Sequence, residues 1–325
     1  MMINDRNIKT WSLIGQRATF GLIALEIVKK QEDLIILTSD VSTSAGLDRF
    51  RKSYPNNFID VGIAEQNLVG IAAGLATEKF KVFTTTFSPF QILRCCEQIK
   101  VNIGYMKQKV CMVGIGSGLA LGTLGYTHCC IEDIGVLRSI PEINIISPAD
   151  SLETVKALEA AVKSDKSTYI RLTGASNNPI VYEKDYNFEI GKSIKLKDGE
   201  DVTIFCSGSM VNNSLEAAKI LENDKVSVKV VNMHTIKPID EEAILNSNKS
   251  KLIVSIEEHN INGGLGSAIA EYNSKLPSSP KQLFIGIKDT YSKGGTYKFL
   301  KEKHRLSPEK IVDDILNEYK KINGQ

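Results

Sequence analysis

The chain has 325 residues, of which 42% are hydrophobic and 24% charged, with a formal net charge of +2. This length fits two domains of ordinary size, and the composition excludes a mainly disordered chain. The near balance of 40 basic and 38 acidic residues gives no reason to expect nucleic acid or a charged membrane surface as a partner.

The amino-terminal residues 1–10 contain no apolar stretch of the signal-peptide kind. The most apolar run, residues 114–125, is too short and too rich in glycine to span a bilayer. The six cysteines have spacings that match no zinc site, so we expect buried, reduced thiols: Cys95, Cys96, Cys111, Cys129, Cys130 and Cys206. Together these features predict a cytoplasmic protein.

Short runs rich in β-branched residues alternate with helical patterns in the first half of the chain. Strands are predicted at residues 34–38, 81–86, 110–115, 143–147 and 169–172. Amphipathic helices are predicted between them, at residues 19–31, 65–77, 91–103 and 151–164. Such alternation implies right-handed βαβ units and a mainly parallel sheet.

A polar stretch without clear period follows at residues 174–188 and is interpreted as a linker. Strands are then predicted at residues 202–206, 226–232, 252–257 and 282–287. Helices are predicted at residues 212–221, 241–245 and 308–320, with another opened by the turn at 263–266. We therefore expect an α/β protein of two domains, each a mainly parallel sheet flanked by helices, at residues 1–175 and 191–325, joined by a linker at 176–190.

The segment at residues 60–67 carries the first candidate for chemistry. Glu65 lies in the first turn of a helix whose following residues are small or apolar. The helix dipole favours the ionised carboxylate, whereas burial favours the protonated acid. Such a carboxyl can share a proton with a ligand nitrogen; the alternative is a glutamate that only caps its own helix.

Two aromatic residues, Phe87 and Phe90, follow the strand predicted at 81–86. Ligands of open α/β sheets bind at the carboxyl ends of the strands, where aromatic side chains can stack on a flat ring. The alternative is a pair of core phenylalanines.

Taken together, several motifs resemble the carboxyl-terminal half of transketolases. They are GIAEQN-x-x-x-x-AAGLA, TTFSPF-x-x-x-R-x-x-E-Q-I, G-x-x-G-x-T-H and SPAD, followed by EEHN-x-x-GGLG and the segment 289–295. The 1-deoxyxylulose-5-phosphate synthases and the β subunits of 2-oxo-acid dehydrogenases share this layout. The resemblance implies a pyrimidine-binding domain, a transketolase C-terminal domain, and the cofactors thiamine diphosphate and Mg²⁺.

The resemblance also assigns residues to the cofactor. It implies that Glu65 is catalytic and hydrogen-bonds the pyrimidine N1′, exchanging a proton at that nitrogen. Phe90 matches the aromatic residue that stacks on the pyrimidine, with Phe87 as a second wall. Ile63 and Asp40 match cofactor-binding positions, although a simple role in the loop turn is open for Asp40.

Three residues match positions near the substrate. His128 matches a catalytic residue beside the cofactor amino group and the substrate oxygens. Arg94 and Arg171 match positions that face substrate phosphate, a task that suits the forked guanidinium. For both arginines, an ion pair at a surface or an interface remains the alternative.

The remaining candidates in the second domain are interpreted as structural. His234, His259 and His304 are expected to have structural or interface roles. The turn at 263–266 lacks the flanking residues of a P-loop, so close packing of a strand against a helix is favoured over anion binding.

The Gly-Asp-Gly…Asn motif with which the family holds Mg²⁺ and the diphosphate does not occur in the sequence. The resemblance therefore implies a separate N-terminal transketolase-like subunit, and self-association through the pyrimidine-binding and C-terminal domains into a heterotetramer. The sugar-phosphate enzymes have a histidine where Gly116 aligns and an acid where Leu124 aligns. A specialised sugar substrate is expected for this reason.

The leading interpretation is a transketolase-like transferase, active only with its partner subunit, that moves a two-carbon ketol unit from a ketose to an aldehyde. A subunit of the deoxyxylulose-phosphate-synthase or dehydrogenase β type, with a 2-oxo acid donor, is the alternative. A non-catalytic or regulatory subunit is the alternative from another class.

Overall fold

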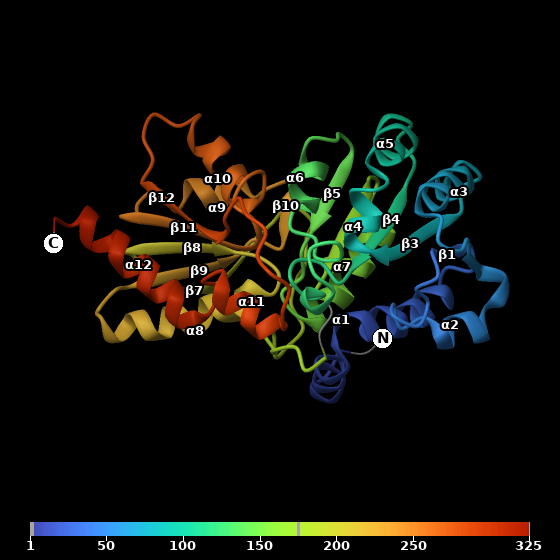
Figure 1. Cartoon of the computed structure of the whole chain (residues 1–325), viewed down its shortest axis with the longest axis horizontal. Helices are drawn as coiled ribbons and strands as arrows, with labels where there is room; N and C mark the ends of the chain where they lie inside the picture. The colour runs from blue at the N-terminus through green and yellow to red at the C-terminus, as the bar shows by residue number, and fades with distance from the viewer. Residues whose placement is uncertain (1–2, 174–175, 325) are drawn as a thin grey trace.

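The computed structural model describes residues 3–173 and 176–324 and contains two sheets, each with helices on both faces (Figure 1). The first sheet has the strand order β10-β5-β6-β4-β3-β1-β2. Its strands are β1 (Leu34–Thr38), β2 (Phe58–Asp60), β3 (Lys81–Phe87), β4 (Val110–Ile115), β5 (Ile143–Ile146), β6 (Ser167–Leu172) and β10 (Thr235–Lys237). Its helical segments are α1 (Asp5–Val28), α2 (Asp48–Ser53), η1 (Pro55–Asn57), α3 (Glu65–Thr77), α4 (Ser88–Ile92), α5 (Cys96–Gln98), η2 (Ile99–Tyr105), η3 (Gly122–Leu124), α6 (Asp133–Arg138) and α7 (Ser151–Lys163).

The second sheet has the strand order β12-β11-β8-β9-β7. Its strands are β7 (Ile194–Lys197), β8 (Val202–Cys206), β9 (Val228–Asn232), β11 (Leu252–Asn260) and β12 (Lys281–Ile287). Its helices are α8 (Met210–Asn223), α9 (Glu241–Leu245), α10 (Leu265–Asn273), α11 (Tyr297–Lys303) and α12 (Pro308–Ile322). All strand pairs are parallel except β10 with β5 and β7 with β9, so the expected α/β class with two mainly parallel sheets is confirmed.

Strand β1 shows why both faces of the sheet need helices. Leu34 and Ile36 enter one hydrophobic core, and Ile35 and Leu37 enter the other. Side chains alternate between the faces of a strand, so a strand that is apolar throughout must be covered on both sides. Within the described ranges, no helix is both long and apolar enough to cross a bilayer.

Strand β10 was not predicted from the sequence. It comes from the second half of the chain but pairs antiparallel with β5, with Thr235 opposite Ile146. The two sheets are therefore tied together by a strand that lies beyond the proposed linker at 176–190.

The helix predicted at residues 91–103 is broken in the structure. Helix α4 begins at Ser88, with Pro89 in its first turn, and ends at Ile92; α5 and the π-helical segment η2 follow. Proline suits this first turn because its nitrogen has no proton to leave unpaired. As a result, Phe90 belongs to α4 and Arg94 lies in the break between two helices.

Candidate active site

The candidate residues gather where β3 ends and α3 begins. Phe87 is the last residue of β3, Phe90 lies one turn later in α4, and Glu65 is the first residue of α3. His128 follows the short helix η3, in the loop beyond β4. This is the edge at which open parallel sheets bind their ligands.

The Glu65 carboxylate is nearly buried, with 4% of the side chain exposed. Its Oε2 accepts a hydrogen bond of 2.6 Å from Nη1 of Arg94. Among the described residues, Arg94 is the hydrogen-bond partner of this carboxylate and no backbone N–H of α3 donates to it, so Glu65 does not cap its own helix here. The carboxylate instead faces a cation beside the positive end of the α3 dipole.

Three rings form an aromatic wall beside this carboxylate. The rings of Phe87 and Phe90 meet edge to face at 6.3 Å, and the His128 ring lies 5.3 Å from Phe90 and 6.3 Å from Phe87. The guanidinium carbon of Arg94 lies 4.2 Å from the centre of the Phe90 ring. The structure thus brings together Glu65, Phe87, Phe90, Arg94 and His128, with Arg94 in an ion pair of the kind that was the alternative to its role toward phosphate.

The loop that carries His128 is held from both domains. Thr127 Oγ1 lies 3.0 Å from Nδ1 of His128. Tyr126 Oη lies 2.8 Å from Nε2 of His304, and the backbone N–H of Gly295 donates to the carbonyl of Gly122. The contact between Tyr126 and His304 was missed at the sequence level, where the only available signal was their position in the Tyr-Thr-His and Lys-His-Arg triplets.

The loop after β4 is closely packed at Gly116. Gly116 has a φ of +66°, and a Cβ there would lie 2.7 Å from Cδ1 of Leu121 and 3.4 Å from Cδ1 of Phe87. Leu121 therefore occupies the space beside Gly116, a role that the sequence analysis missed. Leu124 is 55% exposed, so this side of the loop presents apolar surface.

Arg171 lies apart from the cluster, in a buried ion pair, and its role toward substrate phosphate stays a prediction. Its Nε lies 2.9 Å from Oδ2 of Asp133, with 3% and 0% of the two side chains exposed. Nη2 donates to the carbonyl oxygens of Cys130 and Glu258. The ion pair lies within the first domain, and the bond to the Glu258 carbonyl reaches the second domain.

Two further predicted cofactor residues lie near the same edge. Asp40 follows β1, has a φ of +54°, and its backbone N–H donates to Oδ1 of Asp60. Ile63 lies two residues before Glu65 and is 77% exposed. Their positions place them at the carboxyl ends of the strands, without a hydrogen bond or ring contact that joins them to Glu65 or Phe90 among the described residues.

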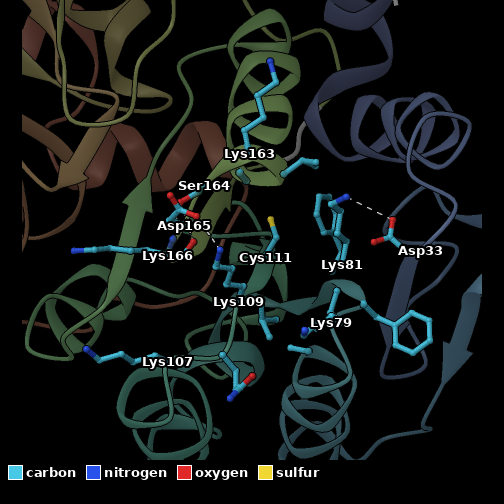
Figure 2. A pocket seen from close by; sticks show the side chains of 18 residues that line it. Asp33, Lys79, Lys81, Lys107, Lys109, Cys111, Lys163, Ser164, Asp165 and Lys166 are labelled. Carbon is cyan, nitrogen blue, oxygen red and sulfur yellow. Dashed lines mark hydrogen bonds and ion pairs between the residues drawn. The ribbon is translucent and has the colours of Figure 1, made fainter.

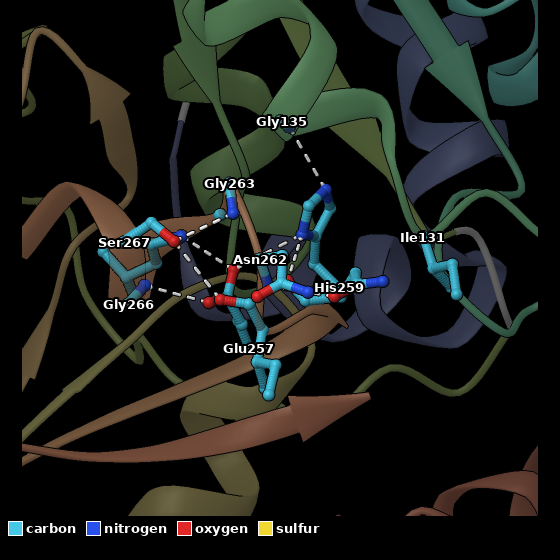
Figure 3. Close-up of polar contacts among 12 residues, drawn as sticks. Ile131, Gly135, Glu257, His259, Asn262, Gly263, Gly266 and Ser267 are labelled. Carbon is cyan, nitrogen blue, oxygen red and sulfur yellow. Dashed lines mark hydrogen bonds and ion pairs between the residues drawn. The ribbon is translucent and has the colours of Figure 1, made fainter. Parts of the chain in front are cut away.

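The glycine turn at 263–266 packs closely instead of binding an anion. Both Glu257 carboxylate oxygens accept backbone N–H groups of α10, from Leu265 and Gly266, as Figure 3 shows for Gly266. A Cβ on Gly264 would overlap this carboxylate. Because Glu257 already caps the helix, no room is left there for an external anion.

The three other histidines make internal contacts. His259 faces the backbone N–H of Gly135 at 3.3 Å, across the domain boundary (Figure 3). The His234 ring stacks on Phe188 at 4.2 Å, and burial lowers its pKa to about 4. These contacts agree with the structural and interface roles that were expected.

A cavity of about 500 Å³ lies at the amino ends of β3 and β4, away from this cluster (Figure 2). Six lysines line it: Lys79, Lys81, Lys107, Lys109, Lys163 and Lys166. Lys81 pairs with Asp33 and Lys109 with Asp165. Helices α3 and α7 end beside this cavity, where cations stabilise the negative end of the helix dipole. The lysines therefore have a structural explanation, and the cavity lies at the edge of the sheet opposite Glu65.

Most of the cysteines are buried in the core. Five of the six thiols are buried, and burial is the main cause that raises the pKa of Cys95 and of Cys206 to about 12. Between residues 3 and 173 and between 176 and 324, no three His, Cys, Asp or Glu side chains are grouped so that they could hold a metal ion.

Comparison with known proteins assigns both parts of the chain to a family. Residues 14–177 match the family described as the transketolase pyrimidine binding domain, and residues 191–311 match the transketolase C-terminal domain. The chain is 38% identical over 309 residues to a protein of Methanocaldococcus jannaschii described as a transketolase C-terminal section, covering 94% of this chain and 97% of the relative. It is 36% identical over 297 residues to the 6-deoxy-6-sulfo-D-fructose transketolase subunit SqwH of Clostridium sp. (strain MSTE9), covering 91% and 92%.

A solved structure of a split-gene transketolase, in the form of an inactive β4 tetramer, superposes with a TM-score of 0.83 at 35% identity, covering 94% of this chain and 97% of that one. The chain therefore belongs to the transketolase family of transferases, as a subunit made of the pyrimidine-binding and C-terminal domains.

Proposed function

We propose that this chain holds the aminopyrimidine ring of thiamine diphosphate between Glu65 and Phe90, and that with a partner subunit it transfers a two-carbon ketol unit from a ketose to an aldehyde. One observation carries the proposal. The flat guanidinium of Arg94 already stacks over Phe90 and donates to the buried Glu65 carboxylate. A flat aromatic ring with a hydrogen-bonding nitrogen fits the same two partners.

Each residue at the carboxyl ends of the strands has its own proposed role. Glu65 holds and exchanges a proton at one ring nitrogen, which a buried carboxyl can do and an amide cannot. Phe90 stacks on the ring and Phe87 forms the second wall. Ile63 and Asp40 flank the cofactor from the loops before α3 and after β1. When bound, thiamine diphosphate supplies the group that stabilises a carbanion during carbon–carbon cleavage and formation.

His128 is the proposed proton carrier for substrate oxygens. Its Nδ1 is engaged with the Thr127 hydroxyl at 3.0 Å. That contact fixes the ring and leaves Nε2 for a hydroxyl or carbonyl oxygen of the sugar, a usual division of work for a catalytic histidine. The contact of its ring with Phe87 and Phe90 keeps it beside the place proposed for the cofactor.

The diphosphate and Mg²⁺ are assigned to a partner. The chain lacks the Gly-Asp-Gly…Asn motif, and the two relatives named above are described as a section and as a subunit of transketolases. We infer an N-terminal transketolase-like subunit, two copies of each chain, and active sites between subunits, where pockets of this kind are frequent.

A specialised sugar is the proposed substrate. Leu121 fills the space beside Gly116, and Leu124 exposes apolar surface on the same loop. A pocket that offers fewer hydrogen-bond partners discriminates against sugars whose hydroxyl groups need them. The standard pentose phosphates are therefore expected to be poor substrates.

The test uses the complex purified with its partner, supplied with thiamine diphosphate, Mg²⁺ and a panel of ketose phosphates and aldehydes. Glu65→Gln is expected to lower turnover by about 100-fold or more, since it removes the proton exchange. Glu78→Gln, which changes an exposed residue at the other end of α3, is the matched control and should keep full turnover. Turnover of the Glu65 variant within twofold of the wild type would refute the catalytic role.

A further inference from the structure

Arg94 makes two contacts that the proposed function assigns to the cofactor ring. Its Nη1 lies 2.6 Å from Oε2 of Glu65, and its guanidinium carbon lies 4.2 Å from the centre of the Phe90 ring. A guanidinium is flat and donates in its plane, as an aminopyrimidine does once a ring nitrogen carries a proton. Two flat groups cannot stack on the same face of Phe90 and bond the same carboxylate oxygen, so Arg94 and the ring exclude one another.

The side chain of Arg94 is partly exposed, whereas its backbone is held by a hydrogen bond. Its side chain is 42% exposed, in contrast to 4% for Glu65. The residue lies in the break between α4 and α5, and its carbonyl accepts a hydrogen bond from the Gln66 amide. Among the described residues, Glu65 is the hydrogen-bond partner of the guanidinium, so one rotation releases it.

The ion pair also matters for the chemistry of Glu65. A guanidinium–carboxylate pair needs an ionised carboxyl, whereas exchange with a ring nitrogen needs a carboxyl that can take up a proton. As long as Arg94 is paired with Glu65, the carboxylate is not free for that exchange.

We propose that Arg94 holds the place of the cofactor ring in the isolated subunit, and that it leaves Glu65 and Phe90 when the ring enters. The inference rests on the proposed function. The displaced guanidinium then lies at the exposed mouth of the site, where the anionic group of a phosphorylated or otherwise acidic sugar can take the place of Glu65 as its partner. Arg94 thereby links occupation by the cofactor to preference for an anionic substrate.

A consequence follows for affinity. When a ligand must displace a side chain, its apparent Kd equals the intrinsic Kd divided by the fraction of the protein in which the site is open. Removing Arg94 should therefore tighten the binding of a bare ring while it weakens the use of an anionic sugar. A merely structural arginine would not shift these two quantities in opposite directions.

The first measurement uses the chain alone and 4-amino-5-hydroxymethyl-2-methylpyrimidine as the probe, by calorimetry and by NMR of ¹⁵N-labelled arginine side chains. Arg94→Ala is expected to bind the probe at least about fivefold more tightly than the wild type. In the wild type, the Arg94 Nε–H resonance should lose its ring-current shift as the probe is added. Arg51→Ala, an exposed arginine paired with Asp48 on α2, is the matched control.

The second measurement uses the complex with its partner. Arg94→Ala should raise the KM for a phosphorylated ketose about tenfold or more and leave turnover at saturation within a fewfold, whereas Arg94→Lys should restore part of the KM. Equal or weaker probe binding by Arg94→Ala, with an unmoved Nε–H resonance, overturns the place-holding role. Full turnover of Glu65→Gln is a separate result, which would remove the proposed function itself.

Discussion

Nε of Arg171 lies 2.9 Å from Oδ2 of Asp133 in a fully buried ion pair that spans β6 and α6. The same carboxylate accepts the Tyr169 hydroxyl at 2.7 Å, and Nη2 of Arg171 reaches the Glu258 carbonyl of β11. The pair therefore joins the two domains at a place that solvent does not reach. Its physical task is to keep the second sheet fixed against the first.

Arg171→Met is expected to lower the free energy of unfolding by about 3–5 kcal/mol, because it leaves the Asp133 carboxylate buried without its cation. Urea unfolding followed by circular dichroism measures this loss. Adding Asp133→Asn to the variant should recover part of it, since the unpaired charge is then removed. The exposed control Arg51→Met should stay within about 0.5 kcal/mol. A stable Arg171→Met protein with a raised KM would instead support the substrate role.

The sequence is enough to predict the position of motifs that lie near the ends of strands. Phe87 and Phe90 follow the strand predicted at 81–86 by a few residues, and Glu65 lies in the first turn of a predicted helix. Parallel strands bring their carboxyl ends to one edge whatever the details of packing. A side-chain contact between two domains leaves no comparable pattern in the neighbouring sequence. The sequence therefore singles out Arg171 as a candidate residue. It does not reveal that the side chain pairs with Asp133 and donates to the Glu258 carbonyl.

Elements whose partners are distant in the sequence were missed for the same reason. Strand β10 has three residues and acquires its sheet only by pairing with β5, about 90 residues earlier in the chain. The break after α4 depends on where Pro89 starts the helix, which apolar periodicity does not locate. The contact between Tyr126 and His304 joins residues that are 178 positions apart.

Tyr126→Phe tests whether that contact positions His128. The variant loses the hydrogen bonds of the hydroxyl group to His304 and Ser292, while the ring packing against Tyr291 remains. We expect turnover of the complex to fall several-fold, with cofactor affinity and melting temperature nearly unchanged, since only the loop that bears His128 is loosened.

His304→Gln should give a similar fall, and the double variant should cost no more than either single one, because both remove one interaction. Tyr319→Phe, which loses a contact with Asp201 far from the site, is the matched control. Additive losses in the double variant would show that Tyr126 and His304 act separately.

Cysteine accessibility gives a test that is independent of activity. Burial raises the pKa of Cys129 to about 11 and that of Cys95 to about 12, and the thiolate is the reactive form. Cys96 is the one cysteine that is only partly buried. Native protein should therefore react with an aromatic disulfide reagent at one thiol per chain and unfolded protein at six, and Cys96→Ser should abolish the native reaction. Rapid reaction of further thiols would contradict the packing described.

The pH dependence of stability has a specific source in Asp150, which is buried at the N-cap of α7. Its carboxylate accepts the backbone N–H groups of Glu153, Val181 and Tyr182, yet burial is the larger influence and raises its pKa to about 6. A carboxyl whose pKa is raised on folding contributes stability that is full below the unfolded pKa near 3.8 and is lost as the pH rises through 6. The free energy of unfolding of the wild type, minus that of Asp150→Asn, should therefore fall by up to about 1.4 kcal/mol per pH unit between pH 4 and 6 and level off above.

Urea unfolding at pH 4, 5, 6 and 7 measures this difference. For Asp165→Asn, the difference in the free energy of unfolding should change with pH in the opposite direction. The hydrogen bond from Lys109 lowers the pKa of the exposed Asp165. The small contribution of Asp165 to stability is therefore lost as the pH falls. A difference for Asp150→Asn that rises between pH 4 and 6 would mean that the three N–H donors outweigh burial. The charged Asp150 carboxylate would then stabilise the start of α7. Protonation of Asp150 would in that case lower the free energy of unfolding as the pH falls.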